Sequence, residues 1–191
     1  MVVRTRLTAD QRREQLLDIS AERFATCAYE DVSMDALARL AGVSRGLLYR
    51  YFPSKRDLFA AIYSRASERL LEVSELTHDG SLEEQIVAGL DAHFDFFIAN
   101  ARTVIEANRG ALAGDPVVQN IINAELGELR RRLLDAVGLI GHERAKASIA
   151  LHGWLAFVRA VSVDWLCTPT LSRDELRDIC LRTLASAMES S

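Results

Sequence analysis

Between residues 44 and 56 the chain carries serine, arginine and lysine side chains at spacings that suit contacts with DNA. Arg45 can form two hydrogen bonds with O6 and N7 of guanine, or it can contact a phosphate instead. Lys55 stands at the expected start of a helix, where its ammonium group and the helix dipole together favour a phosphate. Gly46 either lets the backbone approach another molecule closely or simply weakens the helix that carries it.

Two short helices joined by a tight turn are expected to position these side chains. Ser33 and Ser44 are expected N-caps, whose hydroxyl groups accept hydrogen bonds from the free backbone N–H groups of a helix start. Gly42 lies at the turn, where glycine adopts the left-handed conformation without steric cost. A further helix is expected to begin after Ser54. The pattern predicts a helix-turn-helix whose second helix, residues 44–51, fits the major groove.

Charge is distributed unevenly along the chain. Residues 1–56 carry ten Lys and Arg against seven Asp and Glu, a net +3. Residues 57–191 carry thirteen against twenty, a net −7, and the two parts sum to the formal net charge of −4. A local basic excess attracts phosphates whatever the total charge, so the first part is the expected site of DNA contact. Arg4 and Arg6, near the N-terminus, either reach DNA or form a solvated tail.

An ordered string of residues carries a family resemblance. It consists of Ala38, Ala41-Gly42-Val43-Ser44-Arg45-Gly46, Leu48-Tyr49-Arg50-Tyr51-Phe52, Ser54-Lys55 and Leu58. On this string, the segment from about Arg12 to Tyr63 resembles the DNA-binding domain of the TetR (tetracycline-repressor-like) family of bacterial transcription regulators. The resemblance implies a helix-turn-helix domain over residues 1–56 and a helical effector-binding and dimerisation domain over residues 57–191.

The resemblance also implies roles for single residues. Tyr49 matches a tyrosine that touches the sugar-phosphate backbone or a thymine methyl group, and its alternative role is packing between helices. Tyr51 stands where relatives often carry histidine, so it is a further candidate for a phosphate contact. Arg50 faces either solvent or DNA. The predicted DNA-binding set is Ser33, Ser44, Arg45, Gly46, Tyr49, Arg50, Tyr51 and Lys55.

The rest of the chain favours an all-α fold of about nine helices. Apolar residues recur at three- and four-residue spacings, and signals for strands are nearly absent. We expect a helix break at residues 78–80 and a short irregular segment over residues 101–114. The helix expected over residues 143–166 is apolar nearly all round, so it must be covered on several sides.

That apolar helix and the last helix are the expected dimer interface. One DNA-binding domain contacts only a few base pairs, so useful sequence specificity needs two such domains on one DNA site. The alternative is that the apolar helix is the central core helix of a monomer. The predicted interface residues are Leu151, Leu155, Val158, Ile179 and Leu184.

Large aromatic side chains among a few polar groups in the second part describe either a small-molecule pocket or an ordinary core. The candidate pocket residues are His93, Phe94, Phe97, Asn108, Arg109, Ile122, Trp154 and Phe157. Three of these, His93, Asn108 and Arg109, are the most suggestive polar members. The expected effector is small and mostly apolar, and no metal or other cofactor is expected.

These features predict a ligand-responsive, dimeric, DNA-binding transcription regulator, a repressor that its effector releases from a pseudo-palindromic operator. One alternative is a helix-turn-helix regulator without a small-molecule effector, controlled by abundance or by a protein partner. A hydrolase is the other alternative, because residues 42–46 spell G-x-S-x-G. A nucleophile elbow of that kind needs a preceding strand, whereas a helix is expected here.

A cytoplasmic location is expected. No signal peptide is visible at the N-terminus. The chain lacks a run of about 20 apolar residues, which excludes a membrane-spanning helix on composition. Cys27, Cys167 and Cys180 are expected to be small buried residues in a reducing compartment, and a redox pair formed by Cys167 and Cys180 is the alternative.

Overall fold

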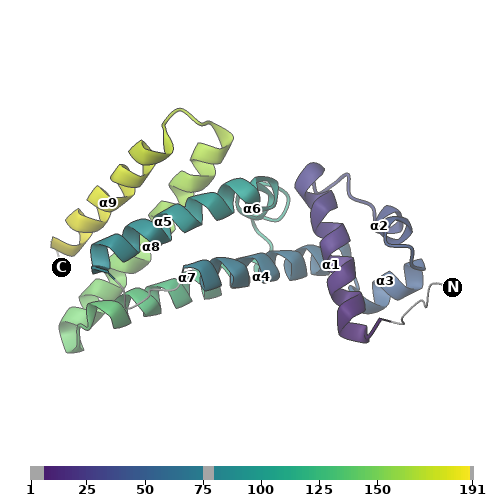
Figure 1. Ribbon diagram of the computed structural model, residues 1–191, viewed down its shortest axis with the longest axis horizontal. Helices are drawn as coiled ribbons and strands as arrows, with labels where there is room; N and C mark the ends of the chain where they lie inside the picture. The colour runs from purple at the N-terminus through teal and green to yellow at the C-terminus, as the bar shows by residue number, and fades with distance from the viewer. Residues whose placement is uncertain (1–6, 75–79, 190–191) are drawn as a thin grey trace. The chain divides into compact units, whose positions relative to one another are not determined.

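The computed structural model describes residues 7–74 and 80–189, and within them it contains nine α-helices and no strand (Figure 1). The helices are α1 Ala9–Thr26, α2 Met34–Leu40, α3 Arg45–Tyr51, α4 Lys55–Val73, α5 Leu82–Ala99, α6 Ala101–Asn108, α7 Pro116–Val137, α8 Gly141–Cys167 and α9 Arg173–Glu189. The all-α prediction is confirmed. Arg4 and Arg6, and residues 78 and 79 of the expected helix break, lie outside the described residues.

The chain divides into two compact units, Met1–Arg65 and Ala66–Ser191. The division lies within α4, whereas we expected a boundary after residue 56, at the start of this helix. The first half of α4 belongs to the first unit because Phe59 is fully buried there. Its ring packs edge-on against Phe24 and Tyr29, with centroid distances of 5.4 and 5.7 Å.

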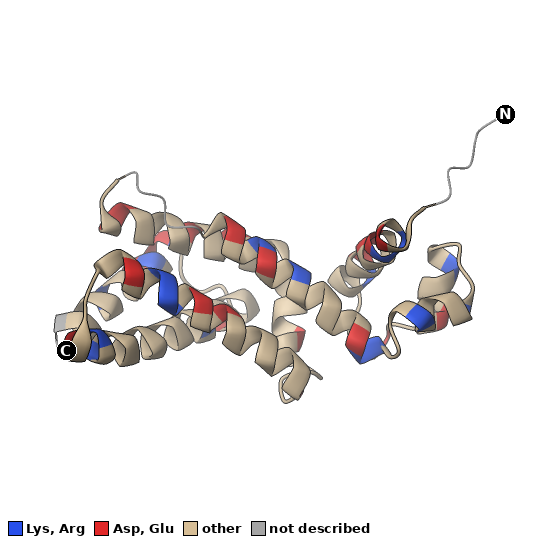
Figure 2. Cartoon of the chain, turned by 90° about the horizontal axis from the view of Figure 1, so that it is seen from below, with Lys and Arg blue, Asp and Glu red and all other residues tan. Residues whose placement is uncertain are grey.

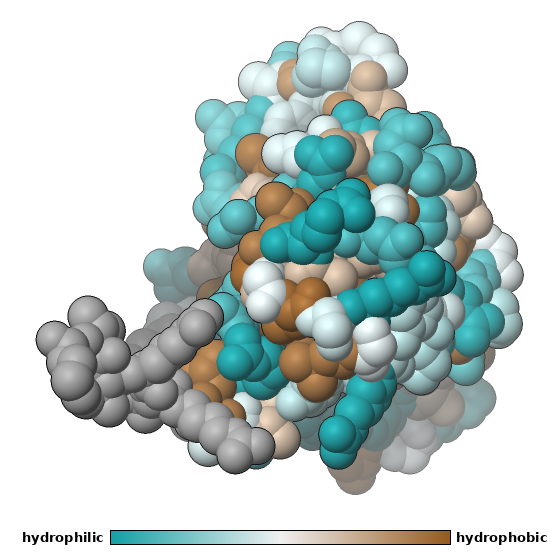
Figure 3. All heavy atoms as spheres, turned by 90° about the vertical axis from the view of Figure 1, so that its right-hand side faces the viewer, coloured by the Kyte–Doolittle hydropathy of each residue, from teal (hydrophilic) through white to brown (hydrophobic). Residues whose placement is uncertain are grey.

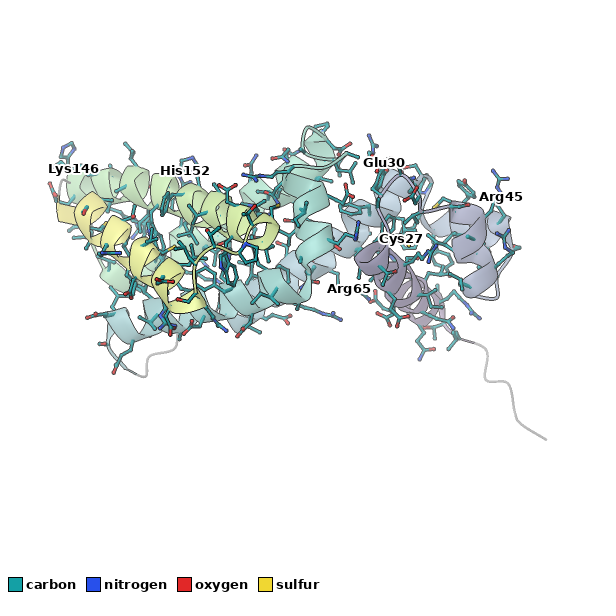
Figure 4. The ribbon with its side chains drawn as sticks, turned by 90° about the horizontal axis from the view of Figure 1, so that it is seen from above. Cys27, Glu30, Arg45, Arg65, Lys146 and His152 are labelled. Carbon is teal, nitrogen blue, oxygen red and sulfur yellow. The ribbon has the colours of Figure 1, made fainter. Side chains whose placement is uncertain are left out.

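In the first unit, α1 and α4 frame the two short helices. Thr8 caps α1 through a reciprocal pair of hydrogen bonds with Gln11. Arg65, labelled in Figure 4, joins α4 to α1 by ion pairs with Glu14 and Asp18, at 3.0 and 2.8 Å. These ion pairs join the two helices that flank α2 and α3 in the chain.

The second unit is built around α8, which packs against α5, α6, α7 and α9. Trp154 donates a hydrogen bond from Nε1 to the carbonyl oxygen of Cys180, 2.8 Å away, and so joins α8 to α9. At the start of α7, Asp115 accepts hydrogen bonds from the N–H groups of Val117 and Val118, and proline follows it at the first helical position.

Among the described residues, α8 is the one helix long and apolar enough to cross a membrane by length and composition. The expectation that composition excludes a span was therefore wrong. The physical reason is that a core helix covered on several sides has the same composition as a span. Leu151, Trp154 and Val158 of α8 are all buried in the hydrophobic core of the second unit, so this side of the helix is a core face.

Two further expectations need correction. The segment over residues 101–114 is not irregular throughout, because α6 occupies Ala101–Asn108 and buries Thr103, Val104 and Ala107 on one face. Its N-cap residue, Asn100, makes no side-chain capping hydrogen bond, so no capping signal marks the start of this helix in the sequence. The three cysteines are not all buried: Cys180 is buried, Cys27 is half-buried and Cys167 is exposed. Burial raises the pKa of the Cys180 thiol to about 11.

Candidate nucleic-acid interface and ligand cavity

Backbone hydrogen bonds fix the turn between α2 and α3. The Gly42 N–H donates to the Arg39 carbonyl at 3.1 Å, and the Val43 N–H donates to the Ala38 carbonyl at 3.0 Å. These two bonds form the Schellman motif that ends a helix, and the motif needs a left-handed residue. Gly42 supplies it with a φ of 63°. The angle at which α3 leaves α2 is therefore set by the main chain.

Serine hydroxyls cap both short helices, as predicted. The Ser44 Oγ accepts from the Leu47 N–H at 3.2 Å, and the Ser33 Oγ accepts from the Ala36 N–H at 3.5 Å. Leu48, in the middle of α3, is fully buried. One face of α3 is thus held in the first unit, while Ser44 and the other exposed residues of its first turn face solvent.

Arg45 lies at the surface, with 67% of its side chain exposed (Figure 4). Its Nε atom is 3.1 Å from Asp35 Oδ1, and its guanidinium carbon lies 5.3 Å from the ring centroid of Tyr49. The carboxylate of α2 and the ring of α3 therefore orient the guanidinium without burying it. Sequence reasoning missed Asp35, because nothing in the sequence indicated that it would meet a residue ten positions away.

Gly46 has no structural reason to be glycine. Its backbone is not in the left-handed region, and a Cβ atom built on it would meet no neighbouring heavy atom within 4 Å. Glycine normally weakens a helix relative to alanine. The open space next to Gly46 is the space in which another molecule could approach the backbone of α3.

Lys55 has partners within the first unit. Its Nζ donates to the carbonyl oxygens of Tyr29 and Glu30, at 2.8 and 3.2 Å, and lies 4.5 Å from the Tyr29 ring centroid. The ammonium group thus holds the segment between α1 and α2, a role that sequence reasoning missed. A phosphate contact through the same ammonium group stays a prediction.

The remaining predicted DNA-binding residues lie at the end of α3. Arg50 is exposed and Tyr51 is half-buried, with its ring tilted against that of Phe52. Figure 2 marks both basic and acidic residues along α1, whereas the sequence of α3 contains two arginines, Arg45 and Arg50, and no acidic residue. Hydrophilic side chains also interleave with apolar ones on the face shown in Figure 3.

The second unit contains a cavity of about 60 Å³, which we call the His93 cavity. It is lined by Ser74, Gln85, Ile86, Gly89, Leu90, His93, Leu129, Arg132, Leu133, Trp154, Leu155 and Val158. Two of the eight predicted pocket residues, His93 and Trp154, are among them. The aromatic rings of Phe94 and Phe97 are fully buried in the core instead.

Four other predicted pocket residues lie elsewhere. Asn108, Arg109 and Ile122 line a separate open groove of about 320 Å³ between α6, α7 and α8. Arg109 forms an ion pair with Asp164 at the surface, and Phe157 packs against the core as a half-buried residue. The predicted set is divided in this way because helical spacing shows which residues share a face but not which neighbour covers that face.

A buried polar network lies between four helices of the second unit. Arg159 of α8 pairs with Glu125 of α7 at 2.8 Å, and the two side chains are only 6% and 1% exposed. Arg159 also donates from Nε to Asn108 of α6 at 3.0 Å. The Ser67 hydroxyl of α4 donates to the other Glu125 oxygen at 2.6 Å. Sequence reasoning missed the network, since these residues are far apart in the chain.

His93 is buried and incompletely paired. It is 8% exposed, and its ring lies 3.9 Å, centroid to centroid, from that of Phe97. Its buried Nε2 atom has no hydrogen-bond partner. Burial, and secondarily the charge of Arg159, lowers the pKa of His93 to about 3, so the imidazole is neutral near pH 7.

The predicted interface residues of α8 need correction. Leu151, Leu155 and Val158 are buried in the core of their own unit, so they have almost no surface to offer a partner. Ile179 and Leu184 of α9 are half-buried. A different face of α8 is exposed, and it carries Ala145, Ile149, His152, Gly153, Ala156 and Ala160. We call this face the α8 stripe. Its largest apolar side chain, Ile149, is 77% exposed.

Residues 16–62 match the model of the family described as bacterial regulatory proteins, tetR family. The transcriptional activator FasR of Mycolicibacterium smegmatis is 28% identical over 155 residues, which cover 71% of this chain and 70% of FasR. The uncharacterized transcriptional regulator TtgW of Pseudomonas putida is 32% identical over 95 residues, which cover 48% of this chain and 70% of TtgW.

Shorter and structural similarities agree with these matches. The transcriptional repressor KstR of Rhodococcus jostii is 42% identical over 60 residues, which cover 31% of this chain and 28% of KstR. A solved tetR-family transcriptional regulator from Streptomyces coelicolor shares the fold with a TM-score of 0.86 at 24% identity. That similarity covers 96% of this chain and 83% of the other.

Replacing Gly46 with alanine separates the two explanations for the glycine. We expect Gly46→Ala to raise the free energy of unfolding by up to about 1 kcal/mol, because alanine favours helix and meets no neighbour. We also expect it to weaken binding to duplex DNA from the protein's own promoter about tenfold, which corresponds to about 1.4 kcal/mol. Urea denaturation and fluorescence anisotropy measure the two effects.

The matched control for this experiment is Gly127→Ala in α7, another helical glycine with open space next to it. It should stabilise the protein in a similar way and leave DNA binding unchanged. Undiminished DNA binding by Gly46→Ala would show that the backbone of α3 does not approach DNA closely.

Breaking the buried ion pair should be costly. We expect Glu125→Leu to lower the free energy of unfolding by about 3–5 kcal/mol, because it leaves the Arg159 charge buried without its partner. The double variant Glu125→Leu, Arg159→Met should recover most of the loss, since apolar side chains can replace a buried pair. Urea denaturation of both variants, beside the exposed control Glu143→Ala, tests this; equal losses in the single and double variants would contradict it.

Proposed function

The chain belongs to the TetR family of bacterial transcription regulators, which bind DNA. On that premise we propose that it is a dimeric repressor, which a small and mostly apolar ligand releases from its operator. Of its relatives, FasR is named an activator and KstR a repressor. We propose repression because it requires only that the bound protein occupies the promoter. A regulator of this kind works where the DNA is, so we place it in the cytoplasm.

The observation that carries the proposal is the exposed first turn of α3. Arg45 is oriented by Asp35 and Tyr49 yet remains exposed, and Gly46 leaves the adjacent backbone open. An exposed arginine next to an open backbone suits a helix that enters the major groove with its N-terminal residues at the base edges. We assign Arg45 to a guanine and Tyr49 to the sugar-phosphate backbone.

The α8 stripe supports dimerisation. Its alanine and glycine side chains are small enough for a second helix to approach closely, and Ile149 provides an exposed apolar contact. We propose that the α8 stripe and α9, including its half-buried residues Ile179 and Leu184, meet their counterparts across a twofold axis. The two DNA-binding domains of such a dimer would contact half-sites about 34–36 Å apart.

The His93 cavity and the buried network support the ligand response. Ser67 lies on α4, and its hydroxyl is held by Glu125, which also binds Arg159 of α8. Because α4 is one continuous helix from Lys55 to Val73, a ligand that moves the walls of the cavity can shift α4 through this network. Reversing operator occupancy from 1:99 to 99:1 requires the ligand to discriminate between the two states by about 5.5 kcal/mol.

The two alternative functions, a regulator without an effector and a hydrolase, would require different structural features. A regulator without an effector would not need the unpaired Nε2 of His93 beside a cavity, because an unpaired buried polar atom is costly. A hydrolase that used residues 42–46 would need a strand before the serine, whereas α2 precedes it. The segment therefore lacks the geometry of a nucleophile elbow.

The variant Arg45→Ala tests whether Arg45 recognises a base in the operator. We expect it to relax the base preference at one position of each operator half-site and to cost about 1–3 kcal/mol on the preferred sequence, because a bidentate pair with guanine is lost. Anisotropy titrations against operators with each base at that position measure the preference. Equal weakening on all sequences would assign Arg45 to a phosphate instead.

Ala156→Arg tests the dimer. The added guanidinium lies in the middle of the α8 stripe and should prevent close packing, so the variant should sediment as a monomer of 21.2 kDa. The protein itself should sediment at twice that mass. Ala88→Arg, at an exposed alanine of α5, is the matched control and should remain dimeric. A dimeric Ala156→Arg variant would place the interface elsewhere.

A further inference from the structure

We infer that the His93 cavity binds an uncharged, mainly apolar molecule that carries one hydroxyl or carbonyl group, and that His93 is the residue that recognises this group. The inference rests on the proposed ligand response and adds the chemical class of the ligand and its polar contact. The supporting observation is which polar side chains of the cavity wall have hydrogen-bond partners and which do not.

The wall of the His93 cavity is mainly aliphatic and aromatic, with few polar side chains. Gln85 donates from Nε2 to the Gly80 carbonyl at 3.2 Å. Among the described residues that line the cavity, His93 has the one buried side-chain nitrogen or oxygen without a hydrogen-bond partner, its Nε2. Nε2 itself has less than 1 Å² of accessible surface, so a ligand reaches it only when the walls of the cavity separate. Leaving such an atom unpaired is costly, so a ligand group that then reaches Nε2 recovers the missing hydrogen bond.

The charges around the cavity argue against an ionised ligand. Arg132, in the wall, donates to Glu128 of its own helix at 2.8 Å and to the carbonyl of Leu71. Arg159, near His93, is paired with Glu125. Both guanidinium charges are therefore already balanced by carboxylates.

The imidazole of His93 is itself neutral, because burial lowers its pKa to about 3. A carboxylate at Nε2 would lose its hydration without gaining a positive partner, and a buried unpaired charge is strongly disfavoured. An ammonium group would lack a negative partner in the same way. A hydroxyl or carbonyl group can form the hydrogen bond without either penalty.

The size of the cavity indicates that the ligand must also open it. An apolar cavity of about 150 Å³ is known to hold benzene, whereas the His93 cavity has about 60 Å³. Even a six-membered ring therefore requires its walls on α5, α7 and α8 to separate. Because α7 carries Glu125, this separation would reach the network that holds Ser67 of α4.

Three cyclohexane derivatives of similar size test the inference on the full-length protein. The probes are cyclohexanol, methylcyclohexane and cyclohexanecarboxylate, and the fluorescence of Trp154 in the cavity wall reports binding. We expect cyclohexanol to bind about three- to tenfold more tightly than methylcyclohexane, as one hydrogen bond allows. Cyclohexanecarboxylate should bind at least about tenfold more weakly than cyclohexanol.

His93→Phe keeps an aromatic ring next to Phe97 but removes Nε2. It should abolish the preference for the alcohol while leaving methylcyclohexane binding nearly unchanged. His93→Gln, which retains a hydrogen-bonding group, should keep part of the preference and serves as the second variant if His93→Phe does not fold. His142→Phe, at an exposed histidine of α8, is the control and should behave like the unaltered protein.

Three results would overturn the inference: no binding of cyclohexanol to the unaltered protein, equal binding of the carboxylate, or a preference for the alcohol that persists in His93→Phe. Operator binding measured on the same samples separates the inference from the proposed function. Failure to bind the operator without any probe would contradict the proposed function alone. Alcohol binding through His93 that leaves operator affinity unchanged would support the inference and contradict the proposed ligand response.

Discussion

A helix of seven residues is too short to persist alone in water, so everything proposed for α3 depends on how the first unit holds it. Three constraints do so. The left-handed Gly42 closes the turn after α2, Leu48 anchors the buried face of α3, and Lys55 fastens the segment before α2 through two carbonyl oxygens. With the helix held in this way, Arg45 can be exposed and still be oriented, which is the condition for reading a base.

In the second unit, α8 has two faces with different roles. The same helix supplies the core residues Leu151 and Trp154 on one side and the exposed α8 stripe on the other. The buried Glu125–Arg159 pair links it to α7, and hydrogen bonds from this pair reach α6 and α4. A shift of any one of these helices disturbs a costly buried charge, so α4, α6, α7 and α8 are expected to move together rather than one at a time.

Local signals explain what the sequence predicted well. The caps at Ser33 and Ser44, the turn at Gly42 and the all-helical fold each depend on residues close together in the chain. The errors concern contacts between distant residues. An all-round apolar α8 does not reveal which side is covered, so Leu151, Leu155 and Val158 were assigned to the wrong surface. Ser67 and Glu125 meet across 58 positions, and no local pattern indicates such a pair.

Methylation of guanine N7 by dimethyl sulfate tests most directly whether α3 reads DNA in the major groove, because N7 is exposed only there. With the protein bound to duplex DNA from its own promoter, we expect protected guanines in two patches on one face of the DNA, about one helical turn apart. Binding that leaves every guanine N7 as reactive as in free DNA would contradict it.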